Sequence, residues 1–250
     1  MATKPLTNKE KQRLRAERAA AALKEKQRRE RRRQIFTAVG VLLALVLVVG
    51  AGFFINSMRD DTSKTASKIP APGSQYGLTI GSASAPHQVV VYEDFLCPFC
   101  GEFEAASHEQ LAQLADQGKV QVEYRPIVLL SGAGPYSSRA TLIWWLVQDK
   151  YGDEVAKKFH DLLFANQPSE QGPFPSRDDL YALAAQAGAN ADELKTAMDN
   201  GEGAAEVADA TNVARDLGVN STPTLVLDGK PFQDGRTPAD LATNLIQALQ

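Results

Sequence analysis

The chain has 250 residues, of which 44% are hydrophobic and 23% are charged, and it has only two cysteines. This composition excludes a disordered chain and a disulfide-rich scaffold, and the length allows one large domain or two small ones. The net charge of −3 combines two unlike parts. Residues 1–34 hold 13 basic and four acidic side chains, whereas the remainder holds 14 basic and 26 acidic side chains.

Residues 1–34 form a basic arm rich in Ala, Glu, Lys, Arg and Gln, all of which favour helix. The arm has no apolar stripe, so we expect a helix in water or on a membrane surface. Anionic lipids of the inner leaflet attract such a segment. Nucleic acid is the alternative partner, but the arm contains no aromatic residue to stack on bases. We therefore expect a lipid surface and no nucleic acid.

Residues 35–55 contain no charged side chain. A helix of roughly 20 apolar residues spans the hydrocarbon core of a bilayer. Five arginines lie just before this segment, and a single arginine followed by two aspartates lies after it. This asymmetry predicts a single transmembrane helix with a cytoplasmic N-terminus and an extracytoplasmic C-terminal part. A cleaved signal peptide is the alternative, but its apolar region is shorter, about 7–15 residues, and this segment ends in Phe53, Phe54 and Ile55.

Residues 56–75 are rich in Ser, Thr, Lys, Pro and Gly and are typical of a linker. The folded domain is predicted over 76–250. Strands are expected at Leu78–Ile80 and at 88–92, where the run of β-branched residues indicates burial on both faces. Apolar residues then recur at three- and four-residue steps from Cys100 to Leu114, which predicts a helix that begins at Cys97.

Alternation from Lys119 to Val128 predicts another strand, with Val120, Val122 and Tyr124 on one side. Residues 136–217 read as a block of helices. Strand pattern returns at Thr224–Leu227, a turn at Asp228 and Gly229 leads to a short edge strand, and an amphipathic helix ends the chain. The order of elements predicts an α/β fold with a helical insertion.

The two cysteines stand together as Cys97-Pro98-Phe99-Cys100. A thiol attacks only as a thiolate, and the free N–H groups and positive dipole at a helix N-terminus stabilise that anion. Pro98 fits the first helical position, where a missing N–H has no cost. Cys100 shares the inward apolar stripe and Cys97 does not. We therefore predict that Cys97 is exposed and attacks, and that Cys100 is shielded and resolves.

Half of a zinc site is the alternative interpretation of the two cysteines. Structural zinc requires four ligands, and the three histidines, His87, His108 and His160, are scattered along the sequence. We therefore expect neither a metal nor a cofactor.

The segment 89–104, VVVYEDFLCPFCGEFE, and the segment 218–224, GVNSTPT, resemble the active-site segment and the cis-proline loop of DsbA-like thiol–disulfide oxidoreductases. The resemblance covers 76–250 and implies a thioredoxin-like fold with a helical insertion. It implies that Cys97 is the nucleophile, Cys100 the resolving cysteine and Pro223 a cis-proline packed against the disulfide. Thr222 would present its backbone to an extended substrate peptide, with Pro98 and Phe99 also at the binding surface.

Two positions depart from the family pattern. Many members carry a carboxylate six residues before the first cysteine, where it moves protons to and from the buried thiol, and this chain has Val91 there. Glu93 is the candidate substitute, with Asp94 as a second choice. Strongly oxidising relatives often have His before the second cysteine, and Phe99 cannot donate the hydrogen bond that such a His supplies.

The resemblance implies an enzyme that forms disulfides in unfolded exported proteins and is re-oxidised by a quinone-linked membrane partner of the DsbB or vitamin-K-epoxide-reductase (VKOR) type. An envelope disulfide reductase or isomerase is the enzymatic alternative. A redox-inactive holdase or interaction domain that uses the apolar surface around Phe99 is a further alternative, in which an intact cysteine pair has no purpose.

Overall fold

The computed structural model describes residues 72–73 and 75–250. Within this part of the chain, no helix is both long enough and apolar enough to cross a bilayer. The predicted basic arm, 1–34, and the predicted membrane span, 35–55, lie outside the described residues, as does most of the linker 56–75.

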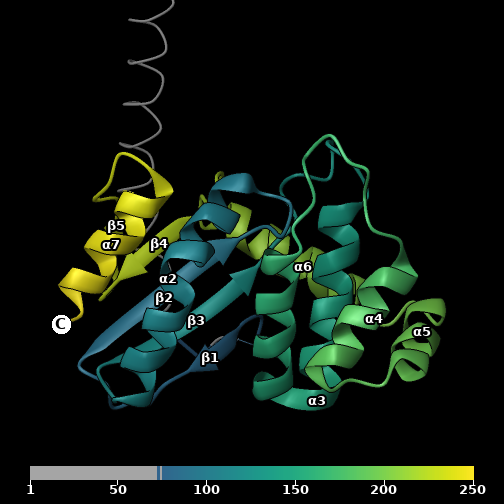
Figure 1. Ribbon diagram of the computed structural model, residues 1–250, viewed down its shortest axis with the longest axis horizontal. Helices are drawn as coiled ribbons and strands as arrows, with labels where there is room; N and C mark the ends of the chain where they lie inside the picture. Colours follow the sequence, from purple (N-terminus) through teal and green to yellow (C-terminus); the bar gives the residue numbers. More distant parts are fainter. Residues whose placement is uncertain (1–71, 74) are drawn as a thin grey trace, which may run out of the picture. The chain divides into compact units, whose positions relative to one another are not determined.

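A five-stranded mixed sheet forms the centre of the domain, in the order β1-β3-β2-β4-β5 (Figure 1). Strand β2, His87–Glu93, pairs in parallel with β3, Val120–Pro126, and antiparallel with β4, Thr224–Leu227. The short strands β1, Leu78–Ile80, and β5, Lys230–Phe232, pair antiparallel at the two edges. The helical crossover that joins β2 to β3 is long enough to allow parallel pairing.

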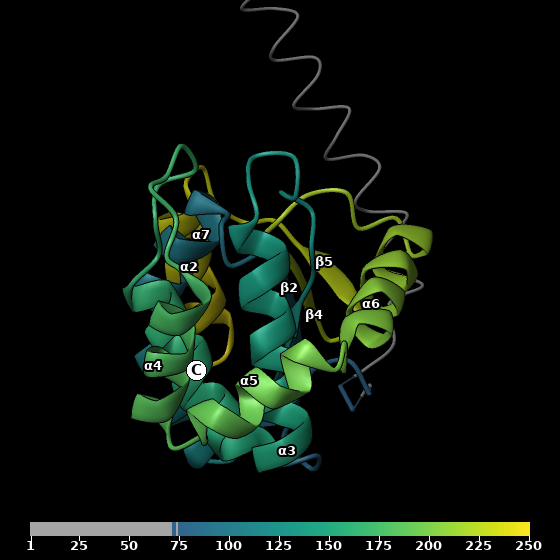
Figure 2. The ribbon, with the colours of Figure 1, turned by 90° about the vertical axis from the view of Figure 1, so that its right-hand side faces the viewer.

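Helices cover both faces of the sheet (Figure 2). Helix α2, Pro98–Asp116, and helix α7, Pro238–Ala248, pack on one face, and α6, Ala204–Asp216, lies on the other. Val89 and Val91 of β2 therefore join the large core under α2 and α7, whereas Val90 and Tyr92 join a small cluster on the α6 side. The predicted burial of this strand on both faces is confirmed.

The predicted helical block is confirmed and contains four helices among the described residues: α3, Tyr136–Ala165; α4, Arg177–Ala187; α5, Ala191–Asp199; and α6. Helix α3 is interrupted at Gly152, whose φ of 78° lies in the left-handed region that favours glycine. Serine and asparagine side chains cap the N-termini of α4 and α5.

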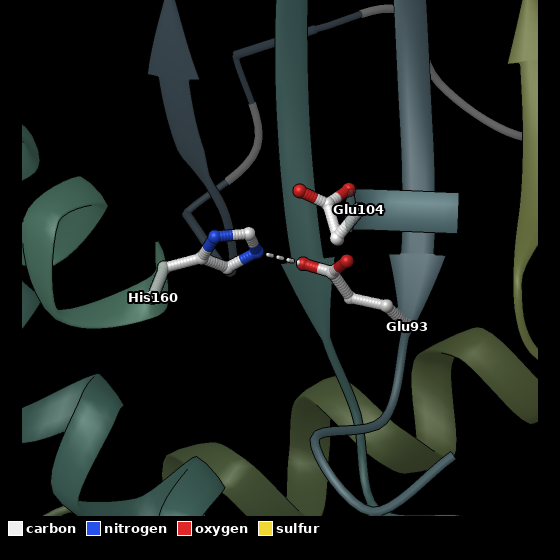
Figure 3. Close-up of side chains that lie close together, drawn as sticks. All are labelled: Glu93, Glu104 and His160. Atoms are coloured by element: carbon white, nitrogen blue, oxygen red, sulfur yellow. Dashed lines mark hydrogen bonds and ion pairs between the residues drawn. The ribbon is translucent and has the colours of Figure 1, made fainter. Parts of the chain in front are cut away.

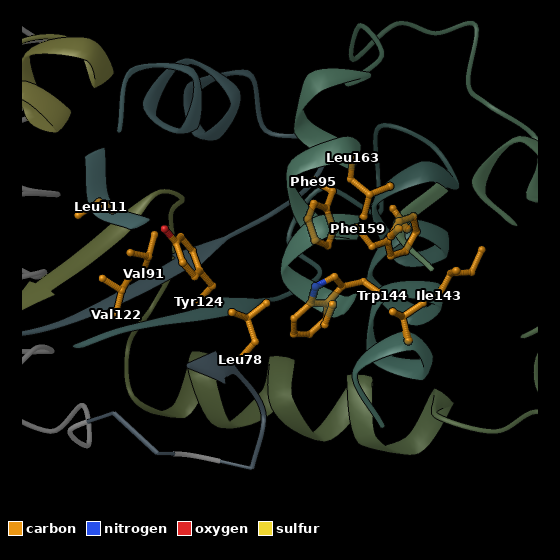
Figure 4. Close-up of a cluster of buried hydrophobic side chains, with 14 of the residues drawn as sticks. Leu78, Val91, Phe95, Leu111, Val122, Tyr124, Ile143, Trp144, Phe159 and Leu163 are labelled. Carbon is orange, nitrogen blue, oxygen red and sulfur yellow. The ribbon is translucent and has the colours of Figure 1, made fainter. Parts of the chain in front are cut away.

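The core continues from the sheet into the helical block through Phe95, which follows β2 (Figure 4). Its ring lies 6.3 Å from Trp144, 5.7 Å from His160 and 5.2 Å from Phe164, measured between centroids. All three partners belong to α3. The segment just before Cys97 is therefore fixed by aromatic packing against the insertion.

The polar side of β3 is buried as well, which its sequence alternation did not predict. Arg125 donates from Nη1 to the Tyr92 hydroxyl at 2.9 Å and from Nη2 to Oε2 of Glu123 at 2.8 Å. This internal pairing satisfies charges that are otherwise costly to bury.

The carboxylate of Asp94 is completely buried and joins three segments of the chain. Its Oδ1 accepts a hydrogen bond from the N–H of Leu96 at 2.9 Å. Its Oδ2 accepts from the N–H groups of Leu129 and Leu130 at 2.8 and 2.9 Å and from the Ser137 hydroxyl at 2.7 Å. The loop before Cys97, the loop after β3 and the start of α3 therefore depend on one side chain.

We expect Asp94→Asn to reduce the free energy of unfolding by about 2–4 kcal/mol. An amide nitrogen cannot accept, so at least one buried donor loses its partner, and hydrogen bonds to charged groups contribute about 1.5–3 kcal/mol each. Urea denaturation measures the change. The control, Asp116→Asn on the exposed end of α2, should change stability by less than about 0.5 kcal/mol. Equal stability of both variants would contradict the role of Asp94.

Candidate active site

Cys97 is the N-cap residue of α2 and stands directly after the loop that leaves β2. Its backbone is extended, with φ −71° and ψ 116°, and its carbonyl accepts hydrogen bonds from the N–H groups of Cys100 and Gly101. Pro98 occupies the first helical position, as predicted, and the first turn contains no acidic side chain. The positive end of the helix dipole therefore acts on the Cys97 sulfur without a competing carboxylate.

The pKa of the Cys97 thiol falls from 9.0 to about 6. The largest cause is a hydrogen bond from the Cys100 thiol; burial acts in the opposite direction, and hydrogen bonds from the Thr222 side chain and the N–H groups of Cys100 and Phe99 lower the pKa further. The thiolate is therefore the favoured form of Cys97 at pH 7. The N–H groups at the helix N-terminus, on which the prediction rested, are the smaller contributions, and the Cys100 thiol is the larger one.

Cys100 is completely buried, and burial raises the pKa of its thiol well above 9.0, with further contributions from Cys97 and from the charge of Glu93. Both cysteines are free thiols in the structure. The prediction that Cys97 is exposed was wrong in degree, because only 5% of its surface reaches solvent. Its Sγ lies 3.3 Å from the backbone oxygen of Thr222, to which the neutral thiol can donate.

The predicted cis-proline loop lies beside the cysteines. The Thr222–Pro223 peptide bond is cis, as the resemblance implied. Strand β4 begins at the next residue, and its first residue, Thr224, pairs with Tyr92 near the end of β2. This register brings the loop to the N-terminus of α2. Thr222 and Pro223 are half-buried, so part of their surface remains available.

The outer rim of the site is apolar. Phe99 is 58% exposed, and among the described residues the other exposed large hydrophobic side chain, Val213, is only 36% exposed. Pro98 is also exposed. The two residues between the cysteines therefore form an exposed surface next to the Cys97 sulfur.

Gln167 is a positioning residue that the sequence did not reveal. It follows α3, and its Nε2 donates to the backbone oxygens of Phe95 at 3.0 Å and Cys97 at 2.9 Å. A side chain in place of Gly101 would meet Oε1 of Gln167 at 2.2 Å, so this contact also requires glycine there. A single Gln after a helix has no sequence signal that distinguishes it from an ordinary loop residue.

Glu93 is completely buried at the end of β2, and the structure places His160 and Glu104 beside it (Figure 3). Nε2 of His160 lies 2.5 Å from Oε1 of Glu93. Burial lowers the pKa of His160, but the charge of Glu93 and hydrogen bonds to Asp161 and Glu93 outweigh it and raise the value to about 9. Burial, followed by the charge of Glu93, raises the pKa of Glu104 to about 8. His160 is far from Glu93 in the sequence, but the fold makes the buried Glu93 carboxylate its partner.

Comparisons with solved structures agree with this geometry. The chain is similar to the reduced form of the disulfide bond oxidoreductase DsbG from Mycobacterium tuberculosis, with 29% identity, coverage of 71% of this chain and 88% of that chain, and a TM-score of 0.57. It is also similar to oxidised DsbA from the same organism, with 28% identity, coverage of 69% and 92%, and a TM-score of 0.55. BdbD from Bacillus subtilis, 22% identical with a TM-score of 0.61 and coverage of 72% and 95%, shares the fold.

Curated relatives match over a shorter part of their own length. The Na(+)/H(+) antiporter NhaA 1 of Salinispora arenicola is 30% identical over 151 residues, which is 60% of this chain and 21% of the antiporter. The serine/threonine-protein kinase PknE of M. tuberculosis is 25% identical over 175 residues, 66% of this chain and 31% of the kinase. The chain thus spans between a fifth and a third of these relatives.

A family model described as thioredoxin matches residues 74–247. The match contains the central sheet, both cysteines at the start of α2 and the cis-proline loop before β4. The chain belongs to the thioredoxin family.

Proposed function

We propose that this chain is a protein thiol–disulfide oxidoreductase that forms disulfides in exported proteins. The observation that carries the proposal is the opposite treatment of two neighbouring thiols. Cys97 has its pKa lowered to about 6, and Cys100 has its pKa raised. A stabilised Cys97 thiolate makes the Cys97–Cys100 disulfide a strong oxidant, because the reduced product is the favoured state.

In the proposed reaction, a substrate thiolate attacks Cys97 of the disulfide form, and the Cys100 sulfur leaves with the bonding electron pair and takes up a proton. A second substrate thiolate then attacks the substrate sulfur of the mixed disulfide and releases Cys97 as thiolate. The substrate gains a disulfide, and the enzyme becomes a dithiol. A quinone-linked membrane partner of the DsbB or VKOR type then takes two electrons and two protons from the dithiol, which regenerates the Cys97–Cys100 disulfide and completes the cycle.

Glu93 is the proposed proton donor and acceptor for Cys100. It is completely buried at the end of β2, and its charge acts on the Cys100 thiol. A buried thiol cannot exchange its proton with bulk water directly, so a nearby ionisable group has a clear purpose. His160 holds one oxygen of this carboxylate in place.

An extended substrate peptide is proposed to lie against the backbone of Thr222, with Pro98 and Phe99 on its other side. This loop already contacts the Cys97 sulfur through its carbonyl oxygen. Exposed aromatic surface next to a backbone edge suits unfolded chains of varied sequence.

The second candidate activity is reduction, which runs the same two cysteines in the opposite direction, or isomerisation, in which the Cys97 thiolate rearranges substrate disulfides without net electron transfer. A holdase is disfavoured by the surface, since Phe99 and Val213 are the large hydrophobic side chains found exposed in the described residues. Binding of unfolded chains without redox chemistry requires a larger apolar patch.

Trapping experiments test the cysteine roles. Cys100→Ser retains a hydroxyl that can donate to Cys97, so Cys97 of this variant should still attack substrate disulfides. Mixed disulfides should accumulate because the resolving thiol of Cys100 is missing. Cys100→Ala lacks this donor, which is the largest cause of the lowered pKa, and its Cys97 should therefore alkylate with a higher pKa than that of Cys100→Ser. Iodoacetamide rates between pH 4.5 and 9, followed by peptide mapping, measure both. In the unsubstituted chain, faster labelling of Cys100 than of Cys97 would reverse the assigned roles.

The direction of the reaction can be tested by thermal melting of the dithiol and disulfide forms. The pKa of Cys97 is lower in the folded dithiol than in the unfolded chain, so the thiolate stabilises the folded dithiol form. This stabilisation is complete above the unfolded pKa of 9.0 and is lost as the pH falls to the folded pKa of about 6. Between pH 6 and 9 the free energy of unfolding of the dithiol form should therefore increase relative to that of the disulfide form, by on the order of 1.4 kcal/mol per pH unit. The melting temperature of the dithiol form should rise accordingly. A disulfide form that melts higher throughout this range would favour the reductase.

The location proposed for the enzyme is the bacterial cell membrane, with residues 35–55 as an anchor and the domain outside. Protease added to spheroplasts should degrade the domain 76–250 and leave residues 1–34 protected. A cytoplasmic marker protein that stays intact is the control. Soluble protein in the medium that begins after residue 55 would show that the span is cleaved instead.

A further inference from the structure

We propose that Glu93, Glu104 and His160 bind one divalent cation of the zinc type in the core of the domain. The ligands come from the end of β2, the middle of α2 and the second half of α3. All three side chains are buried, and one ligand atom from each lies within 4.8 Å of the others. Figure 3 shows the two carboxylates and the imidazole directed toward one another.

The carboxylate oxygens in this cluster have unused bonding capacity. Oε2 of Glu93 and both oxygens of Glu104 are buried and have no hydrogen-bond partner among the described residues. Glu104 is only 2% exposed. Two adjacent carboxyl groups that share a proton are normally joined by a hydrogen bond, and neither oxygen of Glu104 makes one. A cation between the ligands would satisfy these oxygens together, which removes the cost of burying them unpaired.

The imidazole turns its Nε2 toward Oε1 of Glu93, and a cation at this point would replace the proton of that hydrogen bond. Nδ1 of His160 lies 3.1 Å from Oδ1 of Asp161, which can accept its proton and leave Nε2 toward the carboxylates. Asp161 is itself held by Lys157, whose Nζ lies 2.6 Å from the same oxygen. A carboxylate on the second nitrogen of a metal-bound histidine fixes the ring and increases its basicity. The arrangement Asp161–His160 supplies this outer partner.

A cavity of about 250 Å³ lies between α2 and α3 beside the cluster. Glu104 forms part of its wall, together with Gly101, His108 and Asp161. The carboxylate oxygens of Glu104 are buried behind this wall, so a cation that enters from the cavity requires a rotation of the Glu104 side chain.

The donor set selects the class of cation. One imidazole nitrogen and two carboxylate oxygens, with an open fourth position, match zinc and related first-row cations. Calcium requires six to eight oxygen ligands. A charge of +2 also balances the two carboxylates once the cation has displaced the proton between His160 and Glu93. A bound cation would occupy the Glu93 carboxylate and so suspend the proton exchange proposed above.

Zinc binding can be measured without interference from the cysteines. The full chain with Cys97→Ser and Cys100→Ser, purified in detergent and treated with a chelator, should take up one Zn²⁺ in equilibrium dialysis. Adding Glu104→Gln should weaken that binding by tenfold or more, and Asp161→Asn by roughly 10–100-fold. Glu109→Gln, an exposed position on the same helix, is the matched control and should bind as the parent does.

Thermal melting separates a ligand role from a purely structural one. Without metal, Glu104→Gln should melt no lower than the parent, because it removes one of two facing carboxyl groups. With Zn²⁺, the parent should melt higher and the variant should not change. A variant that melts lower without metal, Zn²⁺ binding that survives Glu104→Gln, no Zn²⁺ bound by the parent, or Ca²⁺ bound as tightly as Zn²⁺ would each overturn the proposal. The test does not depend on redox activity.

Discussion

The four hydrogen bonds to the buried carboxylate of Asp94 fix the geometry on which the site depends. They hold the short loop between β2 and α2 against the start of the helical insertion. Gln167 holds the same loop from the end of α3, through the carbonyl oxygens of Phe95 and Cys97. The reactive sulfur thus stands on a loop fixed at several points, and its low pKa requires that fixed position because hydrogen bonds weaken steeply with misalignment.

The sequence predicted much of the fold because its local signals agree with one another. The β-branched run before the cysteines, the proline at the first helical position and the apolar stripe after Cys100 each predicted an element that the structure contains. The cis-proline at Pro223 followed from family resemblance, since no local rule distinguishes it from a trans proline. The difference between the two cysteines followed from helix geometry alone, which places Cys97 at the N-terminus and Cys100 one turn further inside.

The features that the sequence did not predict all arise where distant segments meet. Glu93 and His160 are 67 residues apart, and Gln167 reaches carbonyl groups 70 and 72 residues away. Each of these residues has an ordinary sequence context, and only the docking of α3 against the end of β2 gives it a partner. The burial of Arg125 is similar, because its charge is acceptable in β3 only once Glu123 and Tyr92 are alongside.

The Cys97 sulfur and the Thr222 oxygen are 125 residues apart along the chain. A ribosome adds about 5–20 residues per second, so roughly 6–25 s separate the synthesis of these two groups. During that interval the cysteines have neither the loop that contacts Cys97 nor the strand β4 that completes the sheet. A truncated chain that ends before residue 222 would carry the whole cysteine motif and the donors of the first helical turn, but it would lack the hydrogen bond from Thr222. The pKa of Cys97 can therefore reach its full depression only after the chain has been made through Thr222.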